Sequence, residues 1–253
     1  MPVGTAWVGG LVVICLGGLS AFGLWWLGAT KLLAKQFSPE QWAELQERLR
    51  QLPRFSRSYA HWKLRLDPVY ELALAELPTK GELLDLGTGI GLLPVLVALA
   101  RPSLRIRALE WDRRKAEVAR RLLKGLPRAS VEEADARAFP IASTSAITML
   151  DILHYGPPSV ARRWLHACAG ALEPGGVLLI RELEPSTWAV APWLERVAVR
   201  MRLNRGGAVH PHPSSGLAQE LTGLGLTVVR YQAGFGLFRA NTLTVARRPR
   251  SSD

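Results

Sequence analysis

A loop between two apolar runs carries the first residues that could do chemistry, in the segment LLDLGTGIGLL at positions 83–93. Its glycines would let the backbone approach a ligand closely: Gly87, Gly89 and Gly91. A dinucleotide-binding loop has the pattern G-x-G-x-x-G, and Leu92 stands where its last glycine would be. The Asp85 carboxylate, two positions before the first glycine, would repel a pyrophosphate but attract an ammonium group. The loop therefore favours a ligand with an amino group.

Further acidic residues follow at regular intervals. Glu110 stands 19 residues after Gly91, close to the spacing of the ribose-binding acid in nucleotide folds. Asp135 lies in the segment EADAR at 133–137. It could bind the ligand, or it could be a helix cap or a solvated acid. If an acceptor hydroxyl or acidic carbon must lose a proton, histidine is the usual base. The candidates are His154, which could instead be a hydrogen-bonded core residue, His210 and His212.

The elements that would position these residues alternate along the chain. Two helices, at 37–53 with Ser38 as N-cap and at roughly 67–77, precede the glycine loop. Strands are then expected at 82–87, 104–112, 129–137, 145–153 and 175–183, with helices at 92–101, 113–126 and 160–172 between them, and two closing strands at 226–232 and 241–247. This pattern predicts an α/β fold with a doubly wound, mostly parallel sheet. Ligands bind outside the carboxyl ends of such strands, where the glycine loop would lie.

Five motifs in this order resemble those of class I, Rossmann-like S-adenosylmethionine-dependent methyltransferases of the small bacterial type, over roughly Arg57 to Arg247. The motifs are DLGTGIG, ALEWD, EADAR, LDILHY and LEPGGVLLI. The resemblance implies S-adenosyl-L-methionine as the cofactor and no metal. It also implies no amino-group methylation of nucleic acid, because LHYGPP stands where that signature, Asn-Pro-Pro-Tyr, would follow the fourth strand.

The same resemblance implies a role for each motif residue. Asp85 would face the amino group of the methionine part, and the loop of Gly87, Thr88, Gly89 and Gly91 its carboxylate. Glu110 would bind both ribose hydroxyls, and Trp111 would pack against adenine unless it is a core residue. The remaining cofactor-binding residues would be Asp135 at the adenine amino group, Ala136 through its backbone, and Asp151 at the end of the fourth strand. The catalytic base would be His154 or His210.

The chain begins with an uncharged run from Met1 to Thr30, and its segment at 7–28 is 22 residues long. A transmembrane helix needs about 20 apolar residues. Eight Lys and Arg against three Glu follow between positions 31 and 66. We therefore predict a single-pass anchor at 1–30 in the inner membrane, a basic amphipathic helical segment at 31–66 on the lipid surface, and the methyltransferase domain at 67–253 in the cytoplasm. A signal peptide and a buried helix are the alternatives.

The whole sequence has a formal net charge of +11 at pH 7. Nucleic acid, an anionic membrane or an acidic substrate would each fit this charge. Nucleic acid is the weaker partner, because aromatic and basic residues do not interleave in a recognisable binding module. Cys15 and Cys168 are the only cysteines, which fits a reducing compartment.

The predicted reaction is methyl transfer to oxygen or carbon of a hydrophobic small molecule, such as a quinone, an aryl polyene or a polyketide-like lipid. The stretch 185–213 breaks the strand–helix alternation and is expected to be a substrate-side insertion. A nicotinamide-dependent oxidoreductase is one alternative. It is disfavoured by Leu92 in the loop, and because the Tyr-x-x-x-Lys pair that a short-chain dehydrogenase needs far after the loop stands before it here, at Tyr59 and Lys63. The other is a catalytically silent, membrane-tethered cofactor-binding protein.

Overall fold

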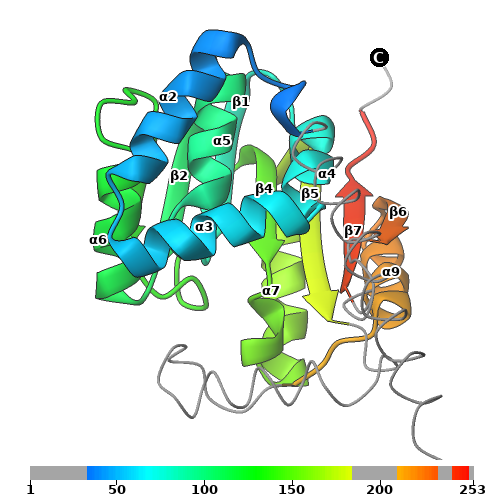
Figure 1. The fold of residues 1–253 in the computed structure, drawn as a ribbon. Helices are drawn as coiled ribbons and strands as arrows, with labels where there is room; N and C mark the ends of the chain where they lie inside the picture. Colours follow the sequence, from blue (N-terminus) through cyan, green and yellow to red (C-terminus); the bar gives the residue numbers. More distant parts are fainter. Residues whose placement is uncertain (1–32, 184–209, 233–240, 251–253) are drawn as a thin grey trace, which may run out of the picture.

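Seven strands form one sheet with helices on both faces in the computed structural model, which describes residues 33–183, 210–232 and 241–250 (Figure 1). The strand order is β3-β2-β1-β4-β5-β7-β6. The strands are β1 (Gly81–Leu86), β2 (Leu104–Glu110), β3 (Ala129–Glu133), β4 (Thr144–Leu150), β5 (Leu172–Leu183), β6 (Thr227–Gln232) and β7 (Asn241–Arg247).

Strands β1 to β5 are parallel, and β7 runs antiparallel between β5 and β6. The predicted doubly wound, mostly parallel sheet is confirmed. The order reverses between β1 and β4, because β2 and β3 extend the sheet on one side and β4 and β5 on the other. This switch point is where an open α/β sheet binds its ligand, so it directs attention to the carboxyl ends of β1 and β4.

The helices of the described residues are α2 (Pro39–Arg50), α3 (Arg54–Leu66), α4 (Val69–Glu76), α5 (Leu92–Ala100), α6 (Arg113–Leu122), α7 (Pro158–Ala171) and α9 (Ser214–Gly223), with a short 3₁₀ turn at Leu153–Tyr155. Helices α2 to α5 bury their apolar side chains in one core, and α7 and α9 bury theirs in a second core on the other face. Alternate residues of β1 enter the two cores: Leu83 the first, Leu84 and Leu86 the second.

Local sequence explains where α2 begins. The Ser38 hydroxyl accepts a hydrogen bond from the backbone of Gln41 at 3.2 Å, and the Gln41 side chain accepts one from the Ser38 backbone at 2.8 Å. This capping box, with Pro39 in the first turn, confirms the predicted start. Leu45 and Leu49 are buried in the first core.

Helix α3 lies within the basic amphipathic helical segment predicted at 31–66, but its own bounds were not predicted. Its apolar residues do not form one stripe: Ala60 and Leu64 are buried, whereas Phe55, Tyr59 and Trp62 are exposed. Helix α3 crosses in front of the sheet, from the side of α6 toward α4 (Figure 1). Helices α2 and α3 share a core with the sheet. The predicted division of the chain at residue 66 stays a prediction.

The predicted membrane anchor at 1–30 and most of the predicted insertion at 185–213 lie outside the described residues. Within the part that the structure describes, no helix combines the length and apolar character needed to cross a bilayer.

Candidate active site

The glycine loop joins β1 to α5 at the switch point. Gly87, Gly89 and Gly91 all have positive φ, at 73°, 61° and 84°, where other residues are strained. A Cβ on Gly87 would lie 2.3 Å from Ile152, and one on Gly91 would lie 2.9 Å from the Ala119 Cβ. A Cβ on Gly89 would have nothing within 4 Å. Two of the glycines are therefore required by packing, and Gly89 leaves open space where a ligand can approach the backbone.

Asp85 lies buried at the end of β1, directly before this loop. Its Oδ1 accepts a hydrogen bond from the Thr148 hydroxyl at 2.6 Å. Its Oδ2 and the Thr88 hydroxyl are buried without a well-formed hydrogen bond. Burial raises the pKa of the Asp85 carboxyl, and the hydroxyls of Thr148 and Thr88 offset part of that rise. A buried carboxylate oxygen in need of a donor fits the ammonium group of a methionine moiety.

Glu110, at the end of β2, ties the second loop of the site to the first. Its Oε2 accepts the Gly89 N–H at 2.7 Å, and its Oε1 accepts the Asp112 N–H at 2.9 Å. Burial raises the pKa of Glu110, and these backbone donors offset part of the rise. Each carboxylate oxygen can accept more than one hydrogen bond, so Glu110 keeps acceptor capacity for the two ribose hydroxyls.

The next residues form an exposed edge rather than a core. Trp111 is 44% exposed, and the Arg137 guanidinium lies 5.4 Å from a ring centroid of the indole. Asp135 forms a bidentate pair with Arg137, with distances from 2.7 to 3.1 Å, which lowers the pKa of Asp135. Ala136 is buried, and its carbonyl accepts a hydrogen bond from the Trp164 indole N–H at 3.0 Å. Adenine binding by Asp135 stays a prediction, and it would require sharing this carboxylate with Arg137.

Asp151 follows β4 with a φ of 58°, the only positive φ of a non-glycine residue among those described. It belongs to a charge cluster that we define as Lys63, Asp67, Asp151 and Arg181. Arg181 lies 2.6 Å from Asp67 and 3.1 Å from Asp151, and Lys63 lies 3.0 Å from Asp67 and 3.6 Å from Asp151. Burial alone would raise the pKa of Asp151, but the charges of Arg181 and Lys63 outweigh it and lower the pKa. The cluster thus joins α3 to the carboxyl ends of β4 and β5.

His154 is the candidate base that the structure pairs with a carboxylate. Its Nδ1 lies 2.9 Å from Glu182 Oε2, and Glu182 Oε1 accepts the Leu153 N–H at 2.8 Å. Both side chains are buried. His210 contributes its backbone, which donates to the His154 carbonyl at 2.8 Å, and the His212 imidazole lies 3.2 Å from the Gly156 carbonyl. A carboxylate at Nδ1 favours the tautomer in which Nε2 carries the lone pair that accepts a proton.

Sequence reasoning missed Glu182, Arg181 and Thr148. One signal was present: the strand segment GGVLLIREL ends in two consecutive charged residues after an apolar run. Carboxyl ends of neighbouring parallel strands meet at one edge, so these charges lie near the end of β4 once the strand order β4-β5 is known. The sequence placed Lys63 in a Tyr-x-x-x-Lys pair and in the basic segment at 31–66, and the structure shows that its partners are Asp67 and Asp151.

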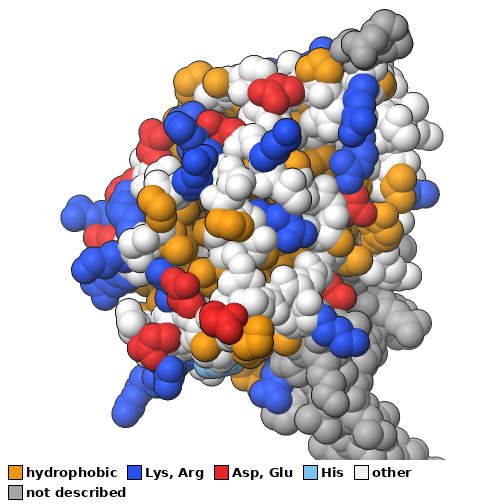
Figure 2. Space-filling view, turned by 90° about the horizontal axis from the view of Figure 1, so that it is seen from above, with side chains coloured by type: hydrophobic (Ala, Val, Ile, Leu, Met, Phe, Trp, Pro, Cys, Tyr) orange, Lys and Arg blue, Asp and Glu red, His pale blue; other side chains and the backbone are white. Residues whose placement is uncertain are grey.

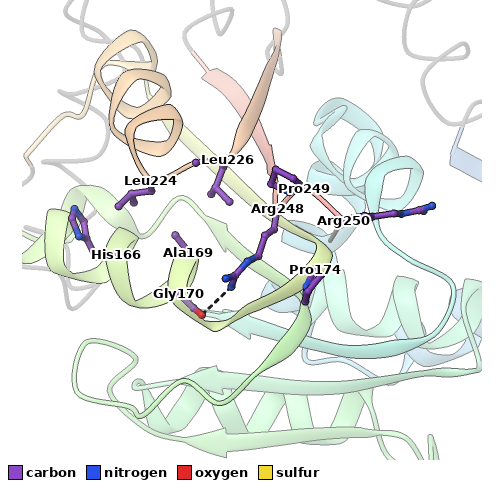
Figure 3. Close-up of a pocket in the computed structure, with 10 residues that line it drawn as sticks. His166, Ala169, Gly170, Pro174, Leu224, Leu226, Arg248, Pro249 and Arg250 are labelled. Atoms are coloured by element: carbon purple, nitrogen blue, oxygen red, sulfur yellow. Dashed lines mark hydrogen bonds between the residues drawn. The ribbon is translucent and has the colours of Figure 1, made fainter. Parts of the chain in front are cut away.

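A separate hollow of about 550 Å³ lies at the opposite, amino-terminal end of β5 (Figure 3). It is bordered by the turn after α7, the turn after α9 and the residues that follow β7. Arg248 points into this region and donates to the Gly170 and Leu172 carbonyls. None of the sequence-predicted site residues lines it. We therefore place the active site at the glycine loop and the carboxyl edge.

Comparison with known proteins identifies the family to which the chain belongs. A methyltransferase-domain family matches residues 56–231, so the chain belongs to this family. The ribosomal RNA small subunit methyltransferase G of Xanthomonas axonopodis pv. citri (strain 306) is 32% identical over 108 residues, which cover 43% of this chain and 46% of that relative. The chain thus aligns with less than half of the curated relative.

Solved structures show the same fold. An O-methyltransferase family protein from Burkholderia thailandensis has a TM-score of 0.60 and 21% identity, covering 84% of this chain and 69% of that one. An O-methyltransferase family 2 protein from Planctomyces limnophilus DSM 3776, in complex with apigenin, has a TM-score of 0.59 and 17% identity. The match covers 81% of this chain and 65% of that one. The S-adenosylmethionine-dependent methyltransferase SibL has a TM-score of 0.59 and 21% identity, and the match covers 92% of this chain and 77% of that one. The chain therefore carries a methyltransferase domain.

Proposed function

We propose that the protein methylates an oxygen or an acidic carbon of a hydrophobic small molecule, with His154 as the general base. The observation that carries this proposal is the buried His154–Glu182 pair at the carboxyl edge of β4 and β5. The pair is built on two parallel strand ends next to the switch point, the place where the donor loop also lies. A positioned general base assists transfer when the acceptor must lose a proton, and histidine serves most often.

The residues of the chain divide the work as follows. S-Adenosyl-L-methionine supplies a methyl group already activated on a sulfonium. Asp85 binds the ammonium group, Gly89 leaves room for the methionine part against the loop backbone, and Glu110 binds the ribose hydroxyls. His154 Nε2 takes the proton of the acceptor hydroxyl or carbon. Glu182 holds the ring through Nδ1 and stabilises the imidazolium that forms.

The test is acceptor-dependent methyl transfer in two variants, His154→Ala and Glu182→Gln. We expect kcat to fall by roughly 10²–10⁴-fold in His154→Ala and by a smaller factor in Glu182→Gln, with unchanged cofactor affinity by calorimetry. His166→Ala is the matched control, because His166 also pairs with a glutamate, Glu220, at 3.0 Å, but on the exposed side of α7. Full activity of His154→Ala would contradict the assignment of the base.

The hydrophobic class of the acceptor is supported by two features. An uncharged run from Met1 to Thr30 precedes the catalytic domain, and three aromatic side chains of α3 are exposed near the charge cluster. The Planctomyces neighbour, which holds apigenin, shows that this fold can hold a flat aromatic molecule. A screen with radiolabelled methyl donor should therefore label lipid extracts, and selective labelling of polar metabolites would contradict the proposal.

Ribosomal RNA is the second acceptor to test, because the curated relative acts in that class by its name. Figure 2 shows Lys and Arg side chains interspersed with acidic and apolar side chains over the described part of one face, rather than a continuous basic stripe. We propose RNA as the less favoured acceptor. Methylation of small-subunit RNA in the same screen, at a rate above that of lipid extracts, would reverse this order.

We also propose that the run at 1–30 is a single-pass anchor in the inner membrane and that the catalytic domain lies in the cytoplasm. The support is the length of the uncharged segment and the basic residues that follow it. An anchored enzyme would meet acceptors that partition into the bilayer.

A further inference from the structure

Helix α3 has apolar side chains on two opposite faces. Ala60 and Leu64 face the protein and are buried. Phe55, Tyr59 and Trp62, which we call the aromatic face, are 74%, 44% and 54% exposed. Their spacing of four and three residues places them on one side of the helix. Since a residue advances 100° around a helix, this side lies opposite Ala60 and Leu64.

The aromatic face is unusual in this molecule. The described residues include five exposed large hydrophobic side chains, and three of them lie within the eight residues from 55 to 62. Scattered exposed apolar residues need no explanation, but a cluster on one helix face indicates an interaction surface.

The basic residues of α3 favour a partner with an anionic surface. The helix sequence RFSRSYAHWKLRL contains three arginines and one lysine and no acidic residue. Lys63 is engaged by Asp67 and Asp151, and Arg57 donates to the Arg50 carbonyl, so the charge next to Phe55 comes from its neighbour Arg54. Arg54 is exposed at the start of the helix. Aromatic side chains flanked by arginine fit an interface that is apolar within and anionic at its surface.

The position of α3 in the chain favours an anionic bilayer as that partner. The uncharged run ends at Thr30, only 24 residues before α3 begins. The first described residue, Leu33, is buried in the same core as α2 and α3. A second copy of the chain fits less well, because a symmetric contact through this face would bring arginines of both copies together. Helix α3 therefore follows closely, along the chain, the run that we propose as the membrane anchor.

We propose that the aromatic face of α3 lies on an anionic lipid bilayer, with its rings at headgroup depth. Tyr59 lies one helical turn before Lys63 on α3, and Lys63 lies 3.6 Å from Asp151, so the aromatic face borders the charge cluster at the carboxyl edge. Docking would therefore place the edge that carries Asp151 and His154 toward the membrane surface. This inference deepens the proposed association with lipid and is independent of the cofactor assignment.

The experiment uses the full chain with Cys15→Ser and a single labelled cysteine, since Cys168 is fully buried. An environment-sensitive fluorophore is attached at Ser58→Cys beside the aromatic face, or at Arg113→Cys on α6 as the matched control. The protein is bound to vesicles of phosphatidylcholine alone or mixed with phosphatidylglycerol. Spin-labelled lipids, which quench fluorophores at headgroup depth, report contact.

We expect a blue shift and quenching at position 58 in the anionic vesicles, a smaller effect in neutral ones, and none at position 113. Adding Phe55→Ser and Trp62→Ser should abolish the effect at 58. Equal signals at 58 and 113 would overturn the proposal. A blue shift without vesicles would assign the face to another part of this chain, or to a second copy if it rises with protein concentration. Calorimetry with S-adenosylmethionine on the same samples separates this result from failure of the methyltransferase assignment.

Discussion

At the scale of single residues, the two buried carboxylates of the donor site differ in how they are satisfied. Glu110 accepts two backbone N–H groups, whereas Asp85 Oδ2 is buried without a well-formed hydrogen bond. Burial raises the pKa of Asp85, so its carboxylate takes up a proton at a higher pH than an ordinary aspartate does. A protonated Asp85 cannot pair with an ammonium group.

We therefore expect the affinity for S-adenosylmethionine to fall on acidification, starting above the usual range of carboxyl titration. Asp85→Asn should weaken binding by roughly 10–100-fold, the value of a hydrogen bond to a charged group, and should remove the pH dependence. Calorimetric titration between neutral and mildly acidic pH measures both effects. The same pH dependence in Asp85→Asn would show that another group controls binding.

The glycine loop gives a second prediction at this scale, from two substitutions with different neighbours. Gly89→Ala meets no atom within 4 Å, so we expect a stability loss of about 1–2 kcal/mol from its backbone conformation alone. Gly91→Ala has the same conformational cost and also crowds Ala119, so it should lose more stability. Folded Gly89→Ala should nevertheless lose cofactor affinity, because its methyl group fills the space left for the ligand. Urea unfolding and calorimetry measure the two properties, and unchanged affinity in Gly89→Ala would contradict the placement of the ligand.

At the scale of elements, the charge cluster joins α3 to β4 and β5 through charges that are mostly buried. Removing Arg181 would leave Lys63 as the single cation of the cluster against the carboxylates of Asp67 and Asp151. Arg181→Met should therefore destabilise the fold by roughly 3–5 kcal/mol. Arg113→Met, at an exposed pair with Glu117, should change stability by less than about 0.5 kcal/mol. Urea unfolding curves compare them, and equal effects would contradict a structural role for the cluster.

The cluster also predicts the direction of a pH effect on stability. Because the folded-state pKa of Asp151 is lowered, its ionised form stabilises the fold at every pH above the pKa of the unfolded chain. This contribution is lost as the pH falls through the lowered folded-state value. Asp151→Asn should accordingly cost stability at neutral pH and less in acid, as thermal unfolding at several pH values would show. A cost that grows in acid would have the wrong sign.

The elements also show what sequence could and could not predict. The glycine loop and the ends of β1 and β2 follow from local patterns, so Asp85, Gly89 and Glu110 were placed correctly at one edge. The His154–Glu182 pair and the charge cluster join segments far apart in the chain, at 63–67, 151–154 and 181–182. Such pairs require the strand order, which residue spacing does not contain. The bounds of helix α3 inside the predicted helical segment at 31–66 were not predicted, because its exposed aromatic residues obscure the single apolar stripe expected of a surface helix.

At the scale of the whole molecule, the two cores give one rigid support for the edge. The helices α2 to α5 pack on one face of the sheet and α7 and α9 on the other, and the strand ends between them carry the donor site and the His154–Glu182 pair. The described fold therefore explains how chemistry is positioned. We propose that its charge distribution and the uncharged run before the fold determine where the molecule works.

The last prediction concerns this orientation in the full chain. Lys31 and Lys35 follow the uncharged run directly, so positive charge should keep the C-terminal side in the cytoplasm. We expect an N-terminal epitope to be reached by protease added to spheroplasts, a C-terminal epitope to be protected, and the chain to stay with the membrane after alkaline extraction. Lys31→Glu with Lys35→Glu and added N-terminal lysines should raise the inverted fraction, because the bias is then reversed. A cleaved N-terminal epitope would instead indicate a signal peptide, and release by alkaline extraction would indicate that the run does not span the bilayer.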